Sequence, residues 1–194
     1  MNRSNIIDTS PAEMIRPERM VLYALVCGLK PLRCLEIGTH TGGSSMIIVA
    51  ALDENGSGKL ACVDPKPEIK PEHWQTVQHR ARLFEASSPQ ILASAANALG
   101  GLFDFALIDG DHSREGVIRD VEGTLPLLAR SACLLFHDVH HEPVASGIKE
   151  VLRKHPNQLV DCGLLSVQRT PDPSPAVFWG GLQMLRFVGF NHKP

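Results

Sequence analysis

Two short apolar segments of the sequence are each followed by a cluster of titratable residues. The first cluster follows residues 105–108 and consists of Asp109, Asp111 and His112. The second cluster follows residues 134–136 and consists of His137, Asp138, His140, His141 and Glu142. Charged groups are costly to remove from water unless they are paired, bind a metal or take part in a reaction. The two clusters therefore predict one site at which they converge.

Acids and histidines of this kind can activate a hydroxyl group. A divalent cation lowers the pKa of the oxygen that it coordinates, and a nearby imidazole can accept the proton. Transfer of a group to that oxygen then depends mainly on in-line placement of the reacting atoms. The same residue types could instead supply the ligands of a two-metal hydrolase. The clusters alone leave both chemistries open.

The segments around the clusters alternate between strand and helix patterns. Strands are predicted at the short apolar runs 33–38, 59–64, 81–86, 103–109, 132–138, 158–165 and 177–190. Helices are predicted at residues 44–58, through Trp74 and Val77, at 88–99, 113–125 and 143–155. This alternation indicates a mostly parallel sheet with helices on both faces. We expect an α/β, doubly wound, Rossmann-like fold with a seven-stranded sheet.

The two ends of the chain depart from this alternation. Residues 10–13 (SPAE) have the form of a capping box and predict a helix start, and a second helix is predicted from Pro17 to near Gly28. Residues 1–30 are therefore expected to form a helical extension over the acceptor side of the site. Residues 177–190 follow a strand with no helix between, which predicts an antiparallel hairpin. With no visible boundary, residues 1–194 are expected to form one domain.

A glycine-rich turn, LEIGTHTGGSS, follows the first predicted strand. Gly38, Gly42 and Gly43 allow a tight turn and a close approach to a ligand, although a plain strand-to-helix turn has the same appearance. The spacing differs from GxGxxG, which argues against NAD. Glu36 suits a cationic ligand, and Asp64 at the end of the next strand could accept hydrogen bonds from both hydroxyls of a ribose.

These residues carry a resemblance to a known family. Glu36-x-Gly38-x3-Gly42, followed by the acid Asp64, resembles motifs I and II of class I S-adenosylmethionine-dependent methyltransferases. The longer stretch FDFALIDGDHSREGVIRDVEGTLPLLARSACLLFHDV is similar to the catechol O-methyltransferase-like branch, particularly its bacterial natural-product and sugar O-methyltransferases. The resemblance runs from about Pro17 to Phe187, and its second motif is the more specific. It implies an O-methyltransferase that acts on a hydroxyl of a small molecule.

The resemblance also implies a role for each matching residue on the cofactor side. Glu36 would hold the methionine amino group of S-adenosylmethionine or the network that anchors it. The methionine and ribose side would be lined by Gly38, Thr39, Gly42, Ser44 and Asp109, with Asp64 and Pro65 at the ribose. The family's Gly-Asp-Ser beside the adenine is Ala86-Ser87-Ser88 in this sequence. Ser88 is retained, whereas the acid is lost.

On the acceptor side, the resemblance implies a divalent metal held by Asp109, His137 and Asp138, with His112 as the general base. Because magnesium prefers oxygen ligands, the imidazole of His137 favours iron, manganese or zinc. In the alternative interpretation, His137 only braces Asp138 and the metal is weak or missing. The acceptor pocket is expected between the N-terminal helices, the loop after Asp138 and residues 169–179.

Composition restricts the partners and the compartment. The net charge of −2 argues against an extended nucleic-acid surface, which would need a surplus of Lys and Arg. The five cysteines contain no CxxC pair, as is typical of reduced cytoplasmic proteins. No apolar run is long enough to span a bilayer, so no membrane contact is expected. The N-terminal helices and the last hairpin are candidate surfaces for a homodimer. A non-catalytic S-adenosylmethionine-binding protein remains a further alternative.

Overall fold

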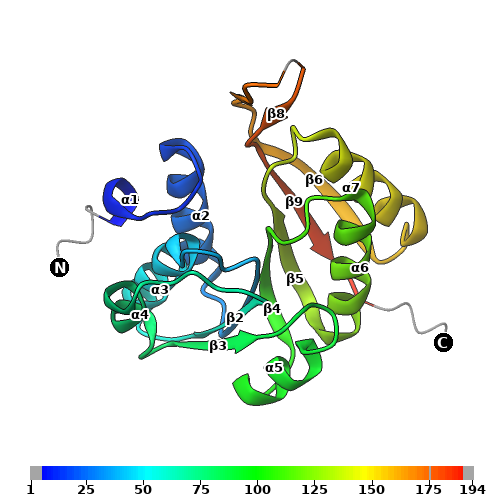
Figure 1. Ribbon diagram of the computed structural model, residues 1–194. Helices are drawn as coiled ribbons and strands as arrows, with labels where there is room; N and C mark the ends of the chain where they lie inside the picture. Colours follow the sequence, from blue (N-terminus) through cyan, green and yellow to red (C-terminus); the bar gives the residue numbers. More distant parts are fainter. Residues whose placement is uncertain (1–5, 175, 190–194) are drawn as a thin grey trace, which may run out of the picture.

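The structure, a computed structural model, describes residues 6–174 and 176–189 and has a three-layer α/β architecture (Figure 1). The first five and last five residues, which belong to the predicted domain 1–194, lie outside the described residues. The main sheet contains β1 (Arg33–Ile37), β2 (Lys59–Asp64), β3 (Ala81–Glu85), β4 (Phe103–Ile108), β5 (Leu128–Phe136), β6 (Leu159–Ser166) and β9 (Leu182–Phe187). The seven predicted strands are therefore confirmed within this part of the chain.

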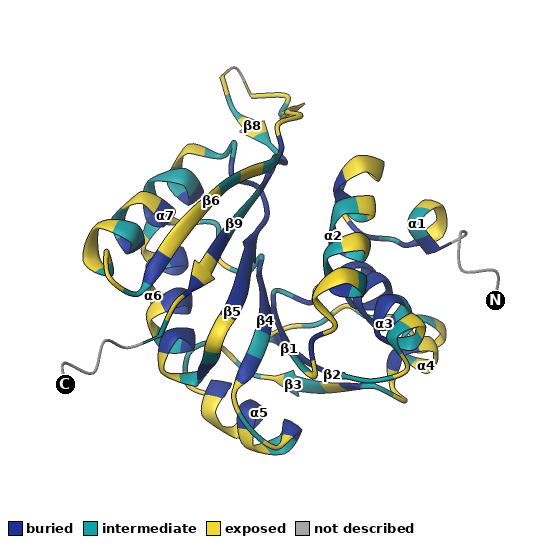
Figure 2. Ribbon diagram, turned by 180° about the vertical axis from the view of Figure 1, so that it is seen from behind, coloured by how far each residue is buried: buried dark blue, intermediate teal, exposed yellow. Residues whose placement is uncertain are grey.

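The order of strands in the sheet is β3-β2-β1-β4-β5-β9-β6. Strands β3, β2, β1, β4 and β5 pair in parallel, whereas β9 pairs antiparallel to both β5 and β6. The predicted antiparallel C-terminal strand is confirmed, and the structure adds that it lies between β5 and β6. The inner strands are buried along most of their length (Figure 2). Their nearly continuous apolar sequences follow from helices that cover both faces.

One face of the sheet packs against α2 (Arg16–Leu29), α3 (Gly43–Asn55) and α4 (Pro71–Val77). The other face packs against α5 (Leu92–Leu99), α6 (Arg114–Thr124) and α7 (Glu142–Lys154), with the short 3₁₀ helix η2 (Leu125–Leu127) after α6. Helix α3 is buried almost throughout, because Met46, Ile47 and Ile48 are followed by further apolar residues on all sides. This arrangement confirms the doubly wound, Rossmann-like fold. Among the described residues, no helix has the length and apolarity to cross a bilayer.

The predicted helix start at residues 10–13 is wrong. Helix α1 (Ile6–Thr9) ends just before this segment, and residues 10–15 form an irregular connection to α2. The Ser10 hydroxyl, which would have capped a helix, donates instead to the backbone carbonyl of Gly43 over 2.7 Å. The Arg19 side chain holds the segment by donating to four backbone carbonyls, those of Ile7, Ser10, Ala12 and Met14. Tertiary contacts thus outweigh the local capping signal.

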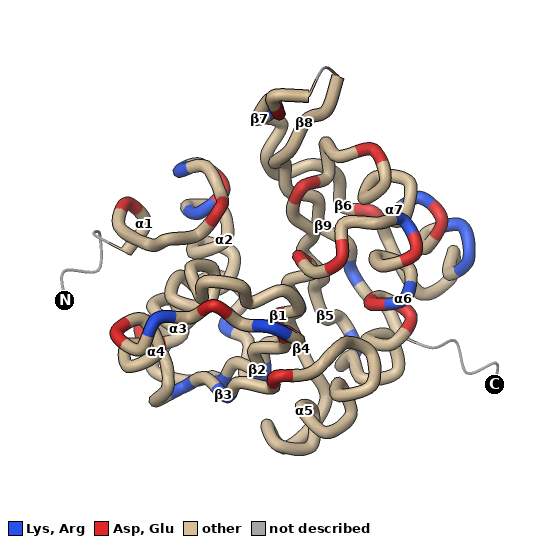
Figure 3. The backbone as a smooth tube through the Cα atoms, in the orientation of Figure 1, with Lys and Arg blue, Asp and Glu red and all other residues tan. Residues whose placement is uncertain are grey.

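The two clusters of titratable residues meet because β4 and β5 are neighbours in the sheet. Both strands run in the same direction, so their carboxyl ends reach the same edge. Acidic positions gather there, between the ends of these strands and the start of α6 (Figure 3). A small two-stranded ribbon, β7 (Thr170–Pro171) with β8 (Phe178–Trp179), projects above the same edge (Figure 1). The convergence expected from the sequence is therefore confirmed.

Candidate active site

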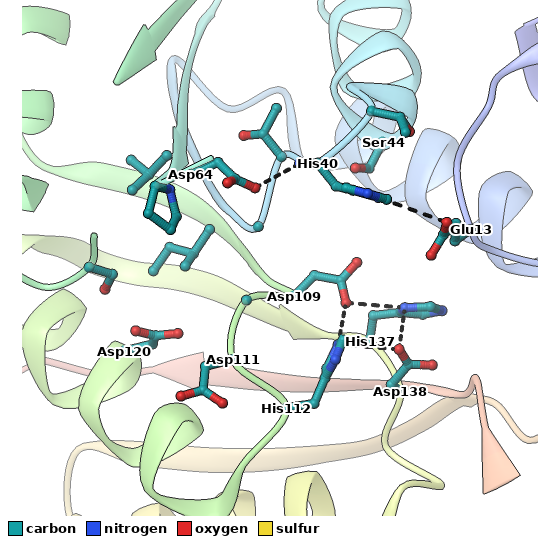
Figure 4. A pocket seen from close by; sticks show the side chains of 18 of the residues that line it. Glu13, His40, Ser44, Asp64, Asp109, Asp111, His112, Asp120, His137 and Asp138 are labelled. Carbon is teal, nitrogen blue, oxygen red and sulfur yellow. Dashed lines mark hydrogen bonds and ion pairs between the residues drawn. The ribbon is translucent and has the colours of Figure 1, made fainter. Parts of the chain in front are cut away.

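A cavity of about 830 Å³ lies at the carboxyl ends of the parallel strands (Figure 4). Most of the residues predicted from the sequence line it, namely Gly38, Thr39, Ser44, Asp64, Pro65, Ser88, Asp109, His112, His137 and Asp138. Glu36 and Gly42 are not among the lining residues; Glu36 lies buried beneath the glycine turn, and Gly42 is the N-cap of α3. The cavity is large enough for a cofactor and a small acceptor together.

The glycine turn brings β1 and β4 into close contact. Gly38 has a positive φ of 90°, and a Cβ at this position would lie 1.9 Å from the backbone oxygen of Asp109. Only glycine fits such an approach. The Gly38 amide donates to the carbonyl of Val63, and the Asp109 amide donates to that of Ile37. The turn therefore fixes the position of Asp109 directly beside the cofactor side of the cavity.

Asp64 closes the cavity at the end of β2. Its Oδ2 accepts a hydrogen bond from the His40 amide over 2.8 Å, and its Oδ1 accepts one from the Lys66 amide over 2.7 Å. Each carboxylate oxygen has about two acceptor sites, so both can accept a further hydrogen bond from a ligand hydroxyl. The carboxylate is thus oriented by the backbone before any ligand arrives.

Glu36 is a buried carboxyl group with one incompletely bonded oxygen. The Ser45 hydroxyl donates to its Oε2, whereas its Oε1 has no hydrogen-bond partner among the described residues. Burial raises the pKa of Glu36 to about 7, and the hydroxyls of Ser44 and Ser45 partly oppose this shift. Ser44 lines the cavity and Glu36 does not, so the carboxyl group of Glu36 lies behind the lining residues.

The buried Glu36 makes the stability of the protein depend on pH. Since the pKa of Glu36 is about 7 in the folded protein and about 4.5 for an unperturbed glutamate, the folded chain keeps a proton that the unfolded chain releases between these values. We therefore expect the free energy of unfolding to fall as the pH rises from about 4.5 to about 7. Urea unfolding of the wild type and Glu36→Gln across this range checks the prediction. The variant should lose most of this slope, and equal slopes would contradict it.

The carboxylate–histidine cluster is compact (Figure 4). His137 Nδ1 lies 3.2 Å from Asp109 Oδ1 and 3.4 Å from Asp138 Oδ2. His112 Nε2 lies 3.4 Å from Asp109 Oδ1 and 3.3 Å from Asp138 Oδ2. One atom each from Asp109, His137 and Asp138 falls within 4.8 Å of the others, a spacing that could surround one cation. These residues are the candidate metal ligands, and His112 stands beside them.

Asp138 reaches the cluster through an unusual backbone conformation. Its φ is 55°, in the left-handed region that aspartate adopts more readily than most residues. The Gly180 amide donates to Asp138 Oδ1 over 2.5 Å, and the His140 amide donates to the Gly180 carbonyl. The segment before β9 therefore holds Asp138 so that its Oδ2 faces the two histidines.

Glu18 in α2 is a site residue that sequence reasoning missed. It is 1% exposed, and its Oε2 lies 3.2 Å from His137 Nε2. Its Oε1 accepts hydrogen bonds from the Gly181 amide over 2.6 Å and from the Ser166 hydroxyl over 3.3 Å. The sequence did contain a signal that Glu18 is buried. Glu18 lies one helical turn before Leu22 and two turns before Val26, and both of these residues are buried. An acid on the buried face of an otherwise apolar helix indicates a partner.

The pKa shifts of the cluster reflect this pairing. Burial by itself would lower the pKa of His137, but the carboxylates of Asp109, Asp138 and Glu18 raise it to about 12. Burial would raise the pKa of Asp109, but the two histidines beside it lower the pKa below its ordinary value. The hydrogen bond with Asp109 raises the pKa of His112, against the effect of burial. The free site is therefore a network of opposite charges.

Trp179 in β8 adds an aromatic wall that the sequence alone could not locate. It lines the cavity, and its ring meets that of His112 edge to face, with centroids 5.5 Å apart. His141 stacks on Trp179 with centroids 4.2 Å apart, and Asp172 accepts a hydrogen bond from the indole N–H over 2.8 Å. Trp179 is therefore held firmly beside the candidate base.

Helix α6 positions two acidic residues near the site. Ser113 is its N-cap and accepts a hydrogen bond from the Gly116 amide, whereas Asp111 accepts one from the Ser113 amide and pairs with Arg119. Asp120, which follows the charged Arg119 in the sequence, is only 3% exposed and lines the cavity. The i, i+3 spacing of Asp120 from the buried Val117 would have been the signal.

Comparisons with known proteins agree with this fold. A crystal structure of cofactor-bound Rv0187 from MTB matches with a TM-score of 0.67 and 20% identity over 96% of this chain and 87% of the other. The O-methyltransferase TomG from Streptomyces achromogenes, in complex with SAM, matches with a TM-score of 0.64 and 16% identity over 96% and 88%. The N-methyltransferase NodS from Bradyrhizobium japonicum WM9, in complex with S-adenosyl-L-homocysteine, gives 0.62 and 14% over 96% and 96%. Because these neighbours include both O- and N-methyltransferases, they do not identify the acceptor atom.

Sequence comparison gives the family itself. No curated protein matches the chain in sequence. A family model described as a methyltransferase domain matches residues 35–139, which include the glycine turn, Asp64, the cluster after β4, and His137 and Asp138 after β5. This match covers more than half of the chain and confirms the resemblance noted in the sequence. The chain belongs to this methyltransferase-domain family.

Proposed function

We propose that this protein is an S-adenosylmethionine-dependent O-methyltransferase that acts on a hydroxyl of a small molecule with the help of a divalent metal. The observation that carries the proposal is the position of His112, Asp109 and Asp138 in the same cavity as the glycine turn and Asp64. A proton acceptor and candidate metal ligands thus stand next to a cofactor-shaped space. The ligands of TomG and NodS, SAM and S-adenosyl-L-homocysteine, also support this cofactor.

The cofactor roles follow from the lining of the cavity. Gly38, Thr39 and Ser44 contact the methionine part, with Glu36 anchoring Ser44 from below. Asp64 accepts hydrogen bonds from the ribose hydroxyls, and Pro65 covers the sugar. The Gly42 N-cap starts α3, whose first residues, Gly43 and Ser44, line the cavity. Ser88 lies beside the adenine of the cofactor, and Asp109 lies between the cofactor and the acceptor.

The acceptor hydroxyl is activated by the residues of the cluster. Asp109, Asp138 and the Nδ1 of His137 are a donor set that fits one divalent cation, and the imidazole favours manganese, iron or zinc over magnesium. Such a cation would lower the pKa of an acceptor hydroxyl. His112 accepts the proton of that hydroxyl at its Nε2, which faces the same carboxylates. The residues then hold the oxygen in line with the methyl carbon and the sulfur. The new C–O bond forms as the C–S bond breaks, and the sulfonium leaves as the neutral thioether.

The acceptor pocket lies on the opposite side of the cluster from the glycine turn. Trp179 from β8 lines the cavity there, whereas Glu13 from the segment between α1 and α2 lines it beside the glycine turn, 3.8 Å from His40. Both belong to regions expected to cover the acceptor, the N-terminal extension and the loop 169–179. Since Trp179 is held against His112, an acceptor ring that packs on it would bring its hydroxyl to the base. The surfaces of a homodimer remain a prediction from the sequence.

The alternative of a two-metal hydrolase is not favoured. Within residues 6–174 and 176–189, one group of three side chains has the spacing for a cation, and that group is Asp109, His137 and Asp138. A hydrolase of that kind would need a second set of ligands nearby. It would also leave the glycine turn and Asp64 without a role.

Calorimetry tests the proposed cofactor directly. We expect S-adenosylmethionine and S-adenosylhomocysteine to bind the purified protein in a one-to-one ratio, whereas NAD should not bind because the glycine spacing does not suit its pyrophosphate. Binding without transfer to any hydroxyl acceptor would favour the non-catalytic alternative. Binding of NAD alone would contradict the proposed cofactor.

Asp64→Ala should weaken cofactor binding. The substitution removes two hydrogen bonds to a charged acceptor, worth roughly 1.5–3 kcal/mol, or about one to two orders of magnitude in the dissociation constant. Titration with S-adenosylhomocysteine measures the change. Asp53→Ala is a matched control, because Asp53 is an acid paired with His79 and Arg80 away from the cavity. An unchanged affinity in Asp64→Ala would contradict the ribose assignment.

Glu18→Gln should weaken metal binding without weakening cofactor binding. Glu18 holds His137 Nε2, so that Nδ1 stays directed at Asp109 and Asp138. Loss of such an outer partner of a metal ligand typically costs about 10–100-fold in metal affinity. Titration with Mn²⁺, followed by its electron paramagnetic resonance signal, measures the effect. Ser166→Ala is the matched control, because it removes another bond of Glu18 and leaves His137 in place. Equal affinities in Glu18→Gln and wild type would contradict this role.

A further inference from the structure

Asp120 is a buried carboxylate that none of the roles above uses. It lies in α6, is 3% exposed, and lines the same cavity as the proposed cofactor site. Figure 4 shows it on the side of the cavity away from His137 and Asp138. A buried carboxylate without a use is rare, because its removal from water is costly unless a partner compensates for it.

The protein itself leaves the carboxylate of Asp120 largely available. Among the described residues, no hydrogen bond of ordinary geometry reaches its carboxylate oxygens, and the Thr124 hydroxyl donates to its backbone carbonyl. The neighbouring Arg119 pairs with Asp111 at 3.0 Å instead. The Ser88 hydroxyl is near enough to lower the pKa of Asp120 somewhat, but its Oγ is buried and forms no hydrogen bond of ordinary geometry with the described residues. Burial raises the pKa of Asp120 above its ordinary value.

The glycine at position 110 leaves room for the Asp120 carboxylate at the wall of the cavity. Gly110 lies next to it, and a Cβ at Gly110 would be 3.0 Å from Asp120 Oδ2. A larger residue at position 110 would therefore crowd the carboxylate. With glycine in the loop after β4, the Asp120 side chain can reach past the backbone to the lining.

The proposed placement of the cofactor puts its adenine at this end of the cavity. With the ribose at Asp64 and the reacting methyl group near Asp109 and His112, the purine must extend towards the remaining lining residues. On the side of the cavity away from His137 and Asp138, the lining includes the hydroxyls of Ser87 and Ser88 and the carboxylate of Asp120. Asp111, also nearby, is half-exposed and already paired with Arg119. Asp120 is therefore the buried carboxylate that can accept a hydrogen bond from the adenine.

We propose that Asp120 accepts a hydrogen bond from the exocyclic amino group of the adenine and so selects an aminopurine nucleoside over its 6-oxo counterpart. The proposal rests on S-adenosylmethionine as the cofactor. It also offers a replacement for the acid that this sequence lacks at Ala86-Ser87-Ser88, supplied by a different element of the fold. A 6-oxo purine would direct a carbonyl oxygen at the carboxylate, and two acceptors without a proton between them repel each other.

The test compares two ligands that differ in this group, S-adenosylhomocysteine and its deaminated form, S-inosylhomocysteine. The wild type should bind the adenine form about 10–100-fold more tightly, the range for a hydrogen bond to a charged group. In Asp120→Asn the amide can donate to the 6-oxo group as well as accept from the amino group, so the preference should fall to a few-fold or less. Glu122→Gln, an exposed position of the same helix that pairs with Lys154, should keep the wild-type preference.

Each result has a distinct meaning. A wild-type protein that binds both ligands equally, or an Asp120→Asn variant that discriminates as strongly as wild type, would overturn the role of Asp120. The comparison of ligands on the wild type stands even if Asp120→Asn does not fold. If neither ligand binds the wild type, the proposed cofactor fails and the inference falls with it. The proposal is supported if the preference for S-adenosylhomocysteine over S-inosylhomocysteine falls in Asp120→Asn but not in Glu122→Gln.

Discussion

His112→Ala should lower kcat by about 10²–10⁴-fold, the range usual for the loss of a general base, and leave the affinity for S-adenosylhomocysteine nearly unchanged. The acceptor hydroxyl keeps its proton without a base, and a neutral hydroxyl is a poor nucleophile. His112 lies beside Asp109 and Asp138 and faces away from the glycine turn, so its removal leaves the cofactor contacts intact. Single-turnover rates with a saturating acceptor measure the change.

A second histidine variant controls for the general effect of losing an imidazole. His79→Ala removes an exposed ring that pairs with Asp53 on the far side of α3, and its kcat should equal that of the wild type. His112→Gln is also informative, because the amide can hold a hydrogen bond in the cluster but cannot accept the proton. It should be as slow as His112→Ala. Full activity in either His112 variant would exclude His112 as the base.

Removal of divalent metal is expected to have the second large effect. Dialysis against a chelator should lower kcat by on the order of 10²-fold or more, because a cation at a developing alkoxide contributes several kcal/mol. Manganese or iron should restore the rate better than magnesium does, since His137 contributes a nitrogen ligand. Activity that is unchanged after complete removal of metal would contradict metal assistance and leave His112 as the sole activator of the hydroxyl.

Asp138→Asn is the variant matched to that experiment. Asparagine tolerates the left-handed backbone at position 138 and can keep the hydrogen bond from the Gly180 amide. It loses the negative charge that faces His137 and His112. The variant should therefore fold normally, bind S-adenosylhomocysteine as the wild type does, and require a higher metal concentration for half-maximal activity. Metal dependence equal to that of the wild type would remove Asp138 from the ligand set.

The sequence was sufficient for the strands and for most of the cavity lining. Buried parallel strands are long apolar runs, and ligand residues follow them directly, so both signals are local. Asp109, His112, His137 and Asp138 lie next to two such runs, and for this reason their convergence could be predicted. The helix expected at Ser10 failed because a tertiary partner, the Gly43 carbonyl, competes with the local cap.

Glu18 and Asp120 escaped prediction for a different reason. Each lies within a helix, and its importance depends on what packs against that helix from elsewhere in the chain. Glu18 contacts His137 across 119 positions of sequence, and no local pattern encodes a partner at that distance. Asp120 has charged and apolar neighbours in sequence, and its carboxylate packs against the loop after β4, which the sequence of α6 does not reveal. The helical periodicity could have indicated that both acids are buried, but not which groups lie beside them.

The insertion of β9 between β5 and β6 has a consequence for the order in which the protein matures. Glu18 is bonded to Gly181 across 163 positions, and Asp138 is bonded to Gly180, so the cluster needs both the start and the end of the chain. Such long-range contacts form late, after the loops between them have closed. A nascent chain that has not yet released β9 from the ribosome therefore has neither a continuous sheet nor a fixed Asp138. The carboxylate–histidine cluster can therefore assemble only after β9 has been synthesised and has entered the sheet.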